Sequence, residues 1–277
     1  MRAVAAAFLV LALAVQQIGA SRTALATVVD SRGRTIVDIE PDDFVVRETG
    51  QPRDVLSVRV ADYPIAIVLD NGRGAGRDFE TIRRAAARFL GRVGHRPVAI
   101  AVADQPQLVA TFDDDRAKVI DRLDQVKSSA SLEGLFQAVV TAARAIQETG
   151  APFSAIVVVS ATPVSSVPAE LLTPILGSGA TVHVVVHQST TTTAAAASTT
   201  TRSAETLRIL TDETHGQFTT IYSAASYQIA LDRLADRLAP ELLVEYVVPV
   251  GSSSGNDVQL GVRIPGARVN GLGVSPR

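Results

Sequence analysis

The sequence predicts an α/β protein with a doubly wound, mostly parallel sheet and a small accessory β domain. Between residues 61 and 240, short apolar runs alternate with amphipathic stretches, as in a parallel sheet with helices on both faces. The flanks 21–60 and 241–277 carry only strand and turn patterns. Because chain ends often lie close together, we expect the two flanks to meet in one small β domain.

In the middle of the chain, each expected strand is a β-branched run, and each expected helix keeps apolar residues three or four positions apart. The run 155–159 is the most apolar and should be a central strand. We interpret Asp113, Asp114 and Asp115 as capping residues of the helix that follows them, with a carboxylate metal site as the alternative. The expected strands are 65–70, 97–102, 107–111, 155–159, 181–187 and 216–220. The expected helices are 78–91, one after Asp115, 131–149, 168–176, 204–214 and 224–238, the last with Ile229, Leu231, Leu234 and Leu238 facing the core.

The flanking segments read as strands bounded by turns. Glycine in the turns at 30–34 and 49–52 suits the positive φ that such turns require. The three strands of the N-terminal flank follow one another without a helix, so we expect them to form a small sheet. The expected flanking strands are 24–29, 42–48, 55–60, 242–249 and 258–264, and the segment 268–274 closes the chain. Residues 189–201 contain only Ser, Thr and Ala, and we expect a surface loop there.

Residues 1–20 are predicted to be a signal peptide. Arg2 supplies a positive charge, the stretch 3–15 is apolar, and the stretch 16–20 turns polar and then small at Gly19 and Ala20. The apolar run is shorter than the roughly 20 residues that span a bilayer, which favours cleavage after Ala20 over a retained anchor. The mature chain is therefore expected to be periplasmic or extracellular, without a membrane span.

Composition argues against several kinds of function. The formal net charge of −2 gives no general attraction to nucleic acid or to anionic membranes. The absence of Cys removes disulfides, thiol catalysis and thiolate metal sites. No nucleophile, base and orienting residue form a set, and the G-x-S-x-G motif of hydrolases is absent. We therefore expect a protein that is not an enzyme.

One stretch organises the chain, the apolar run Ile65–Asp70 followed by the turn Asn71-Gly72-Arg73-Gly74-Ala75-Gly76. An open α/β sheet places its ligand site where a buried strand ends, turns and enters a helix. The stretch therefore marks the expected position of a binding site.

The chain resembles the von Willebrand factor type A (VWA) domain, a Rossmann-type fold, in its VWFA-related form from exported bacterial proteins. The strand 65–70, the helix residues 135–139, the strand residues 156–160 and the helix-to-strand transition 207–217 carry this resemblance. In the flanks, 28–34 with 41–46 and 262–269 are similar to the segments that surround such domains. The resemblance implies an adhesion-type, protein-interaction module with an unidentified protein partner.

The family shares a metal-ion-dependent adhesion site, built from a D-x-S-x-S motif, a Thr from a second loop and an Asp after the central strand. Asp70 matches the first Asp, but the two Ser positions fall on Gly72 and Gly74. The last Asp position falls on Ala161, directly after Ser160. Mg²⁺ requires several oxygen ligands, so a single match implies a degenerate site without a cofactor, in which Asp70 is only a weak candidate ligand.

The Thr position falls near Ser131 or Glu133, depending on the alignment. One alternative is a metal site rebuilt from non-standard ligands among Asn71, Ser131, Glu133, Ser160 and Thr162. A second is an anion or nucleotide site at the Gly72–Gly76 turn, where arginines lie beside a helix N-terminus. We expect binding through the loops 71–77, 128–133 and 161–166. The predicted binding residues are Asp70, Asn71, Gly72, Arg73, Gly74, Arg77, Ser131, Glu133, Ser160 and Ala161.

Overall fold

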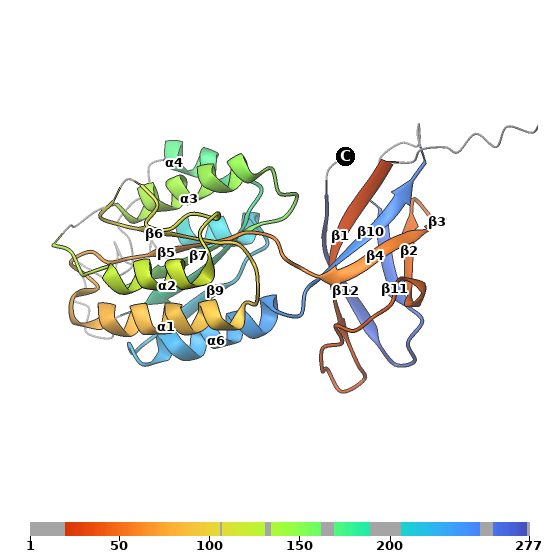
Figure 1. Ribbon diagram of the computed structural model, residues 1–277, viewed down its shortest axis with the longest axis horizontal. Coiled ribbons are helices and arrows are strands. Elements are labelled where there is room, and N and C mark those ends of the chain that lie inside the picture. The colour runs from red at the N-terminus through yellow and green to blue at the C-terminus, as the bar shows by residue number, and fades with distance from the viewer. Residues whose placement is uncertain are drawn as a thin grey trace, which may run out of the picture.

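The computed structural model has two parts, which we call the α/β body and the β module, and which lie side by side (Figure 1). The structure describes residues 20–105, 107–130, 134–161, 169–188, 206–249 and 257–275. The α/β body is built from the middle of the chain, and the β module is built from both flanks. This arrangement confirms the predicted fold class.

The α/β body contains a five-stranded sheet in which all neighbouring strands are parallel, in the order β6-β5-β7-β8-β9. Every residue of β5, β6 and β7 is buried, which explains the uninterrupted apolar sequences of these three strands. The chain moves outward from β5 to β6 and then returns past β5 to β7, so the strand order reverses between β5 and β7. The strands are β5 (Ile65–Leu69), β6 (Val98–Val102), β7 (Ala155–Ser160), β8 (Thr181–His187) and β9 (Phe218–Ile221).

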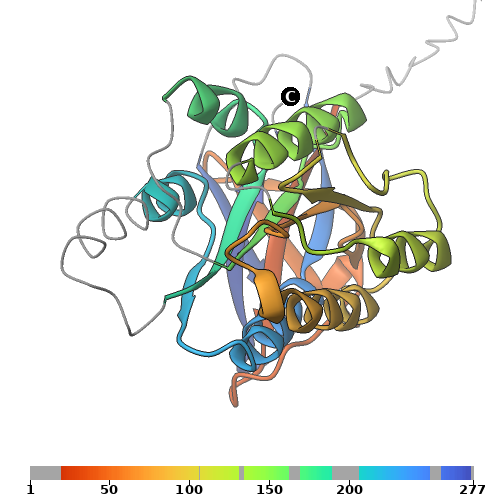
Figure 2. The same ribbon diagram turned by 90° about the vertical axis from the view of Figure 1, so that its left-hand side faces the viewer.

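Helices cover both faces of this sheet, as Figure 2 shows. Helices α1 (Phe79–Arg92), α2 (Arg116–Gln125) and α6 (Ser226–Leu238) pack on one face. Helices α3 (Leu135–Thr149) and α4 (Ala169–Leu176) pack on the other, with the helical residues 206–213. A short 3₁₀ turn, η2 (Gly76–Asp78), leads into α1. No helix that the structure describes is both long and apolar enough to cross a membrane.

The β module consists of two antiparallel sheets that enclose a separate apolar core. Strand β1 pairs with β10 on one side and with β12 on the other, so both flanks of the chain meet in one sheet, as predicted. The N-terminal strands do not form a sheet of their own, because β10 lies between β1 and β4 while β2 belongs to the second sheet. The first sheet contains β12 (Arg268–Val274), β1 (Ala20–Val29), β10 (Leu242–Val248) and β4 (Val55–Val60), and the second contains β11 (Val258–Val262), β2 (Phe44–Glu48) and β3 (Gln51–Arg53), with a short 3₁₀ turn η1 (Pro41–Asp43) before β2.

Other local predictions differ from the structure. The expected strand 107–111 is reduced to a single bridge between Ile100 and Ala110. The side chain of Ile229, expected in the core, is 55% exposed. Asp115 does cap its helix as expected, since its side chain accepts the backbone N–H of Lys118. The predicted leader, apart from Ala20 at the start of β1, and the expected loop 189–201 lie outside the described residues.

Two short linkers, 61–64 and 239–241, join the α/β body to the β module. A buried polar cluster connects the two linkers to each other and to the α/β body. The hydroxyl of Tyr63 donates to the carboxylate of Glu241. The Arg96 guanidinium lies 4.1 Å from the centre of the Tyr63 ring and 3.4 Å from Glu241 Oε2. Burial raises the pKa of Glu241, although Tyr63 and Arg96 oppose this shift. The carboxylate is therefore incompletely compensated by its partners.

Candidate functional site

Asp70 lies at the carboxyl end of β5, where the strand order reverses. Its side chain is 8% exposed. Oδ1 accepts the backbone N–H of Gly72 at 3.1 Å, and Oδ2 accepts the backbone N–H of Ala161 at 3.1 Å. Since Ala161 directly follows β7, the carboxylate connects the ends of two neighbouring strands. It occupies the crevice in which sheets of this topology hold their ligands.

Asn71 forms the corresponding connection on the other side of β5. The side chain is buried, and its Nδ2 donates to Asp104 Oδ1 at 2.6 Å and to the Lys127 carbonyl at 3.0 Å. Its Oδ1 accepts the backbone N–H of Asp104 at 3.2 Å, and its own carbonyl accepts that of Ser129 at 2.6 Å. Asn71 thus joins the end of β5 to the loop after β6 and to the loop after α2.

Helix α6 supports the same region from below the sheet. The hydroxyl of Tyr227 donates to the backbone carbonyl of Ser160 at 2.8 Å, and the ring is fully buried. Burial, and then the negative charges of Asp70 and Asp78, raise the pKa of Tyr227 above its ordinary value. The phenol therefore keeps its proton at neutral pH and acts as a hydrogen-bond donor to the end of β7.

The turn after Asn71 has a buried and an exposed side. Gly72 is buried, whereas Arg73, Gly74 and Arg77 are exposed. The carbonyl of Gly72 accepts the N–H of Ala75 at 3.0 Å, which closes the turn. Neither arginine forms an ion pair with a residue that the structure describes. The exposed side of the turn is therefore positively charged.

The structure brings together five of the predicted binding residues, namely Asp70, Asn71, Gly72, Ser160 and Ala161. It places Arg73, Gly74 and Arg77 on the surface beside them. Ser131, Glu133 and Thr162 lie outside the described residues, so the loops 128–133 and 161–166 are described only in part.

Three positions that supply metal ligands in the VWA family hold residues without a side-chain ligand here. Gly72, Gly74 and Ala161 carry no side-chain oxygen, and both Asp70 oxygens accept backbone hydrogen bonds. Within the part of the chain that the structure describes, no group of three His, Cys, Asp or Glu residues could hold a metal ion. The geometry therefore gives Asp70 a role in holding loops together.

Sequence reasoning missed Asp104 and Tyr227. Asp104 follows the end of β6 closely, much as Asp70 follows β5, and this shared position could have identified it. Tyr227 has no comparable signal, because its contact with Ser160 depends on how α6 packs under the sheet. The loop residues at 127 and 129 take part through backbone atoms, which residue types do not reveal.

Comparison with models of protein families gives no match, and comparison with curated protein sequences gives none either. Among solved structures, a von Willebrand factor type A protein from Catenulispora acidiphila is similar with a TM-score of 0.50 and 10% identity, over 94% of this chain and 74% of that one. The SpRpn10 VWA domain follows with a TM-score of 0.48 and 11% identity, over 63% of this chain and 95% of that one. Proximal thread matrix protein 1 from the mussel byssus has a TM-score of 0.49 and 10% identity, over 76% and 50% of the two chains. At this identity the likeness concerns the fold, and the chain has the von Willebrand factor type A fold.

Proposed function

We propose that this protein is an exported, non-enzymatic interaction module that binds a partner protein through residues 71–77 without a metal ion. The observation that carries the proposal is that Gly72, Gly74 and Ala161 have no side-chain oxygen, while the Asp70 carboxylate accepts the backbone N–H groups of Gly72 and Ala161. A carboxylate held in this way fixes the shape of the loops. The export of the protein rests on the apolar leader in its sequence.

The exposed arginines support the choice of partner chemistry. In a metal-dependent adhesion site, an acidic side chain of the partner completes the coordination of the ion. A guanidinium can bind the same carboxylate through two parallel hydrogen bonds. Arg73 and Arg77 are exposed beside the closed crevice, so the expected partner presents Asp or Glu side chains to this surface.

Calorimetric titration with Mg²⁺, Mn²⁺ and Ca²⁺ tests the absence of a metal. We expect no binding at micromolar concentrations for the purified protein, because Gly72, Gly74 and Ala161 offer no side-chain ligand. Micromolar affinity that disappears in the Asp70→Ala variant would contradict the proposal and would favour a rebuilt metal site.

Capture of proteins from the envelope fraction of the source organism tests the surface. The double variant Arg73→Glu/Arg77→Glu should retain at least tenfold less of any partner that the original protein captures. Arg144→Glu is the matched control, since Arg144 is exposed on α3 on the opposite face of the sheet. Equal capture by the double variant and the control would refute the proposed surface.

A second candidate function is anion or nucleotide binding at the Gly72–Gly76 turn, favoured by the exposure of Arg73 and Arg77 before α1 and by their lack of ion pairs with described residues. Thermal-shift measurements with nucleotides and sugar phosphates separate the two functions. A stabilisation that the Arg73→Ala variant loses would favour the anion site.

A further inference from the structure

The two edges of the five-stranded sheet differ. At the β6 edge, Ile100 donates its N–H to the Ala110 carbonyl at 2.9 Å and accepts the N–H of Val109 at 2.7 Å, so residues 109–110 cover the strand. At the other edge, β9 pairs only with β8 among the strands that the structure describes. An uncovered edge strand can pair with an extended segment of another protein.

The pairing of β9 shows which of its backbone groups face this edge. The N–H of Val184 donates to the Gln217 carbonyl at 2.8 Å, and the N–H of Gln188 donates to the Ile221 carbonyl at 2.9 Å. Backbone groups of successive residues point to alternate sides of a strand. The N–H and carbonyl groups of Phe218 and Thr220 are therefore directed away from β8.

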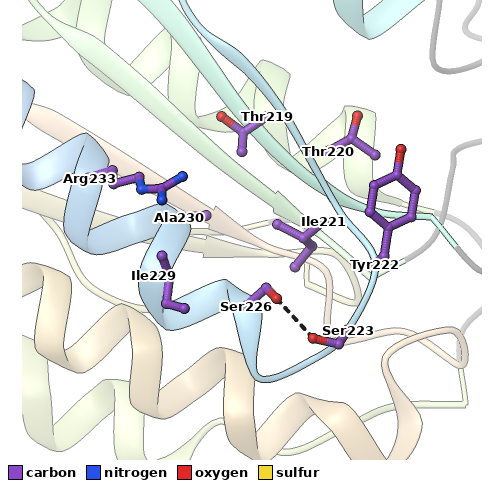
Figure 3. A pocket seen from close by; sticks show the side chains of 9 residues that line it. All are labelled: Thr219, Thr220, Ile221, Tyr222, Ser223, Ser226, Ile229, Ala230 and Arg233. Atoms are coloured by element: carbon purple, nitrogen blue, oxygen red, sulfur yellow. Dashed lines mark hydrogen bonds between the residues drawn. The ribbon is translucent and has the colours of Figure 1, made fainter.

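A pocket of about 380 Å³ lies between β9 and α6. Figure 3 shows the side chains of α6 along one side of it and those of β9 and the following loop along the other. The lining combines an apolar floor with several hydroxyl groups and one charged side chain. Its residues are Thr219, Thr220, Ile221, Tyr222, Ser223, Ser226, Ile229, Ala230 and Arg233.

Two large side chains of this pocket are unusually exposed. Tyr222 is 64% exposed and Ile229 is 55% exposed. Exposed apolar side chains grouped beside a concave surface are typical of binding sites. Ile229 lies off the buried face of α6, which Leu231, Leu234 and Leu238 help to form, so this apolar side chain is available as a contact surface.

The charge around the pocket is positive. Arg233 is the only charged side chain in the lining, and it forms no ion pair with a described residue. Its guanidinium extends from α6 toward β9 (Figure 3). Arg237, one turn later, donates to Gln217 Oε1 at 3.3 Å, beside the start of β9. The acidic residues of α6, Asp232 and Asp236, instead pair with arginines of α1.

We propose that an extended, acidic segment of a partner protein adds a strand to β9, at the edge where no strand described by the structure pairs with it, and lays its side chains into the pocket between β9 and α6. The backbone groups of Phe218 and Thr220 pair with the segment, and Arg233 binds one of its carboxylates. A groove between an edge strand and a helix is a geometry in which known domains bind peptides by strand addition. This site is separate from the surface of residues 71–77 and does not depend on it.

Selection from a displayed library of random peptides tests the proposal, using the purified protein as the target. We expect the enriched peptides to be rich in Asp and Glu and free of Pro. Fluorescence anisotropy should then show at least tenfold weaker binding to Arg233→Glu and to Thr220→Pro. Thr220→Pro removes only an N–H that faces the open edge, where proline is tolerated. Binding to Arg144→Glu and to Arg73→Glu should be unchanged.

N-methylation of the enriched peptide at alternate amides provides a test on the unaltered protein, should Thr220→Pro fail to fold. One of the two methylation patterns should abolish binding and the other should leave it intact, because alternate amides face the strand. The proposal is overturned by no enrichment, by enrichment of neutral or basic peptides, or by equal binding of both methylated forms. Sedimentation measurements provide one more outcome. If the protein is a dimer and Thr220→Pro dissociates it, the edge of β9 pairs with a second copy of this chain, and the proposal of an acidic partner segment is overturned.

Discussion

The five strands of the α/β body follow one another between residues 65 and 221, whereas the β module joins strands from opposite ends of the chain. In the body, the buried polar side chains of Asp70 and Asn71 lie at the carboxyl edge of the sheet, and all residues of β5 and β6 are apolar. In the β module, charged side chains lie inside the structure between the two sheets. Buried polar side chains therefore connect loops at the edge of the sheet in the α/β body, whereas they lie between the two sheets in the β module.

The charged cluster of the β module connects segments that the sequence keeps far apart. Arg22 on β1 forms an ion pair with Glu48 on β2 and donates to the backbone carbonyl of Ser275 at 3.0 and 3.2 Å. Arg53 on β3 lies 3.3 Å from the other oxygen of Glu48. The cluster thereby links both sheets and both chain ends. In the α/β body, continuous apolar strands already specify the pairing, so no such cluster is required inside its sheet.

The variant Glu48→Ala provides the strongest test of this difference. It leaves Arg22 and Arg53 without their common counter-ion in a buried environment, which costs about 3–5 kcal/mol in the free energy of unfolding. Urea denaturation followed by circular dichroism measures the loss. Asp62→Ala, which breaks the exposed pair with Arg59, is the control and should cost less than about 1 kcal/mol. Equal stability of the two variants would mean that the buried cluster does not hold the module together.

The variant Asp70→Asn tests the polar edge of the α/β body and should have a smaller effect. A carboxylate accepts from both Gly72 and Ala161, but an amide has one acceptor oxygen, so one buried N–H loses its partner. The expected loss is about 1–3 kcal/mol in the free energy of unfolding, measured by the same method. The control is Asp113→Asn. The side chain of Asp113 is exposed, so this substitution should change the free energy of unfolding by less than about 0.5 kcal/mol. An Asp70→Asn variant as stable as this control would remove the structural role given to Asp70.

The sequence predicts the α/β body better than it predicts contacts that depend on tertiary packing. The runs 65–70 and 155–159 identify central strands because both of their faces are buried. The meeting of the flanks also follows from their strand patterns. The burial of Ile229 was predicted wrongly, because at 3.6 residues per turn Ile229 lies on the side of α6 opposite Leu238 and therefore off the buried face.

Within the candidate site, the sequence predicts only the residues that directly follow a recognisable strand. Asp70 and Asn71 follow β5 directly, and their position in the sheet was correctly expected. Their partners are set by which strands become neighbours, as with Asp104 after β6, or by how a distant helix packs, as with Tyr227 on α6. These contacts depend on tertiary structure, which residue patterns along the chain do not encode.

The variant Glu241→Gln tests the junction between the two parts and should have the smallest effect. Burial raises the pKa of Glu241, so its charged form is not fully stabilised by Tyr63 and Arg96. The amide can still accept the hydrogen bond from Tyr63. Arg96 keeps its hydrogen bond to the Leu238 carbonyl and its contact with the Tyr63 ring when residue 241 is neutral, so the expected loss at neutral pH is about 1 kcal/mol, the contribution of one hydrogen bond.

The pH dependence of this variant gives the sharper result. With its pKa raised in the folded state, Glu241 contributes stability that is fully present below the ordinary glutamate value near 4.5 and is lost as the pH rises through the raised value. The glutamine variant has no such group. Urea denaturation between pH 4 and pH 8 should therefore show that the stability of the original protein, relative to the variant, falls as the pH rises. A difference that grows with pH would mean that Arg96 stabilises the ionised carboxylate, as the arginines of the β module stabilise Glu48.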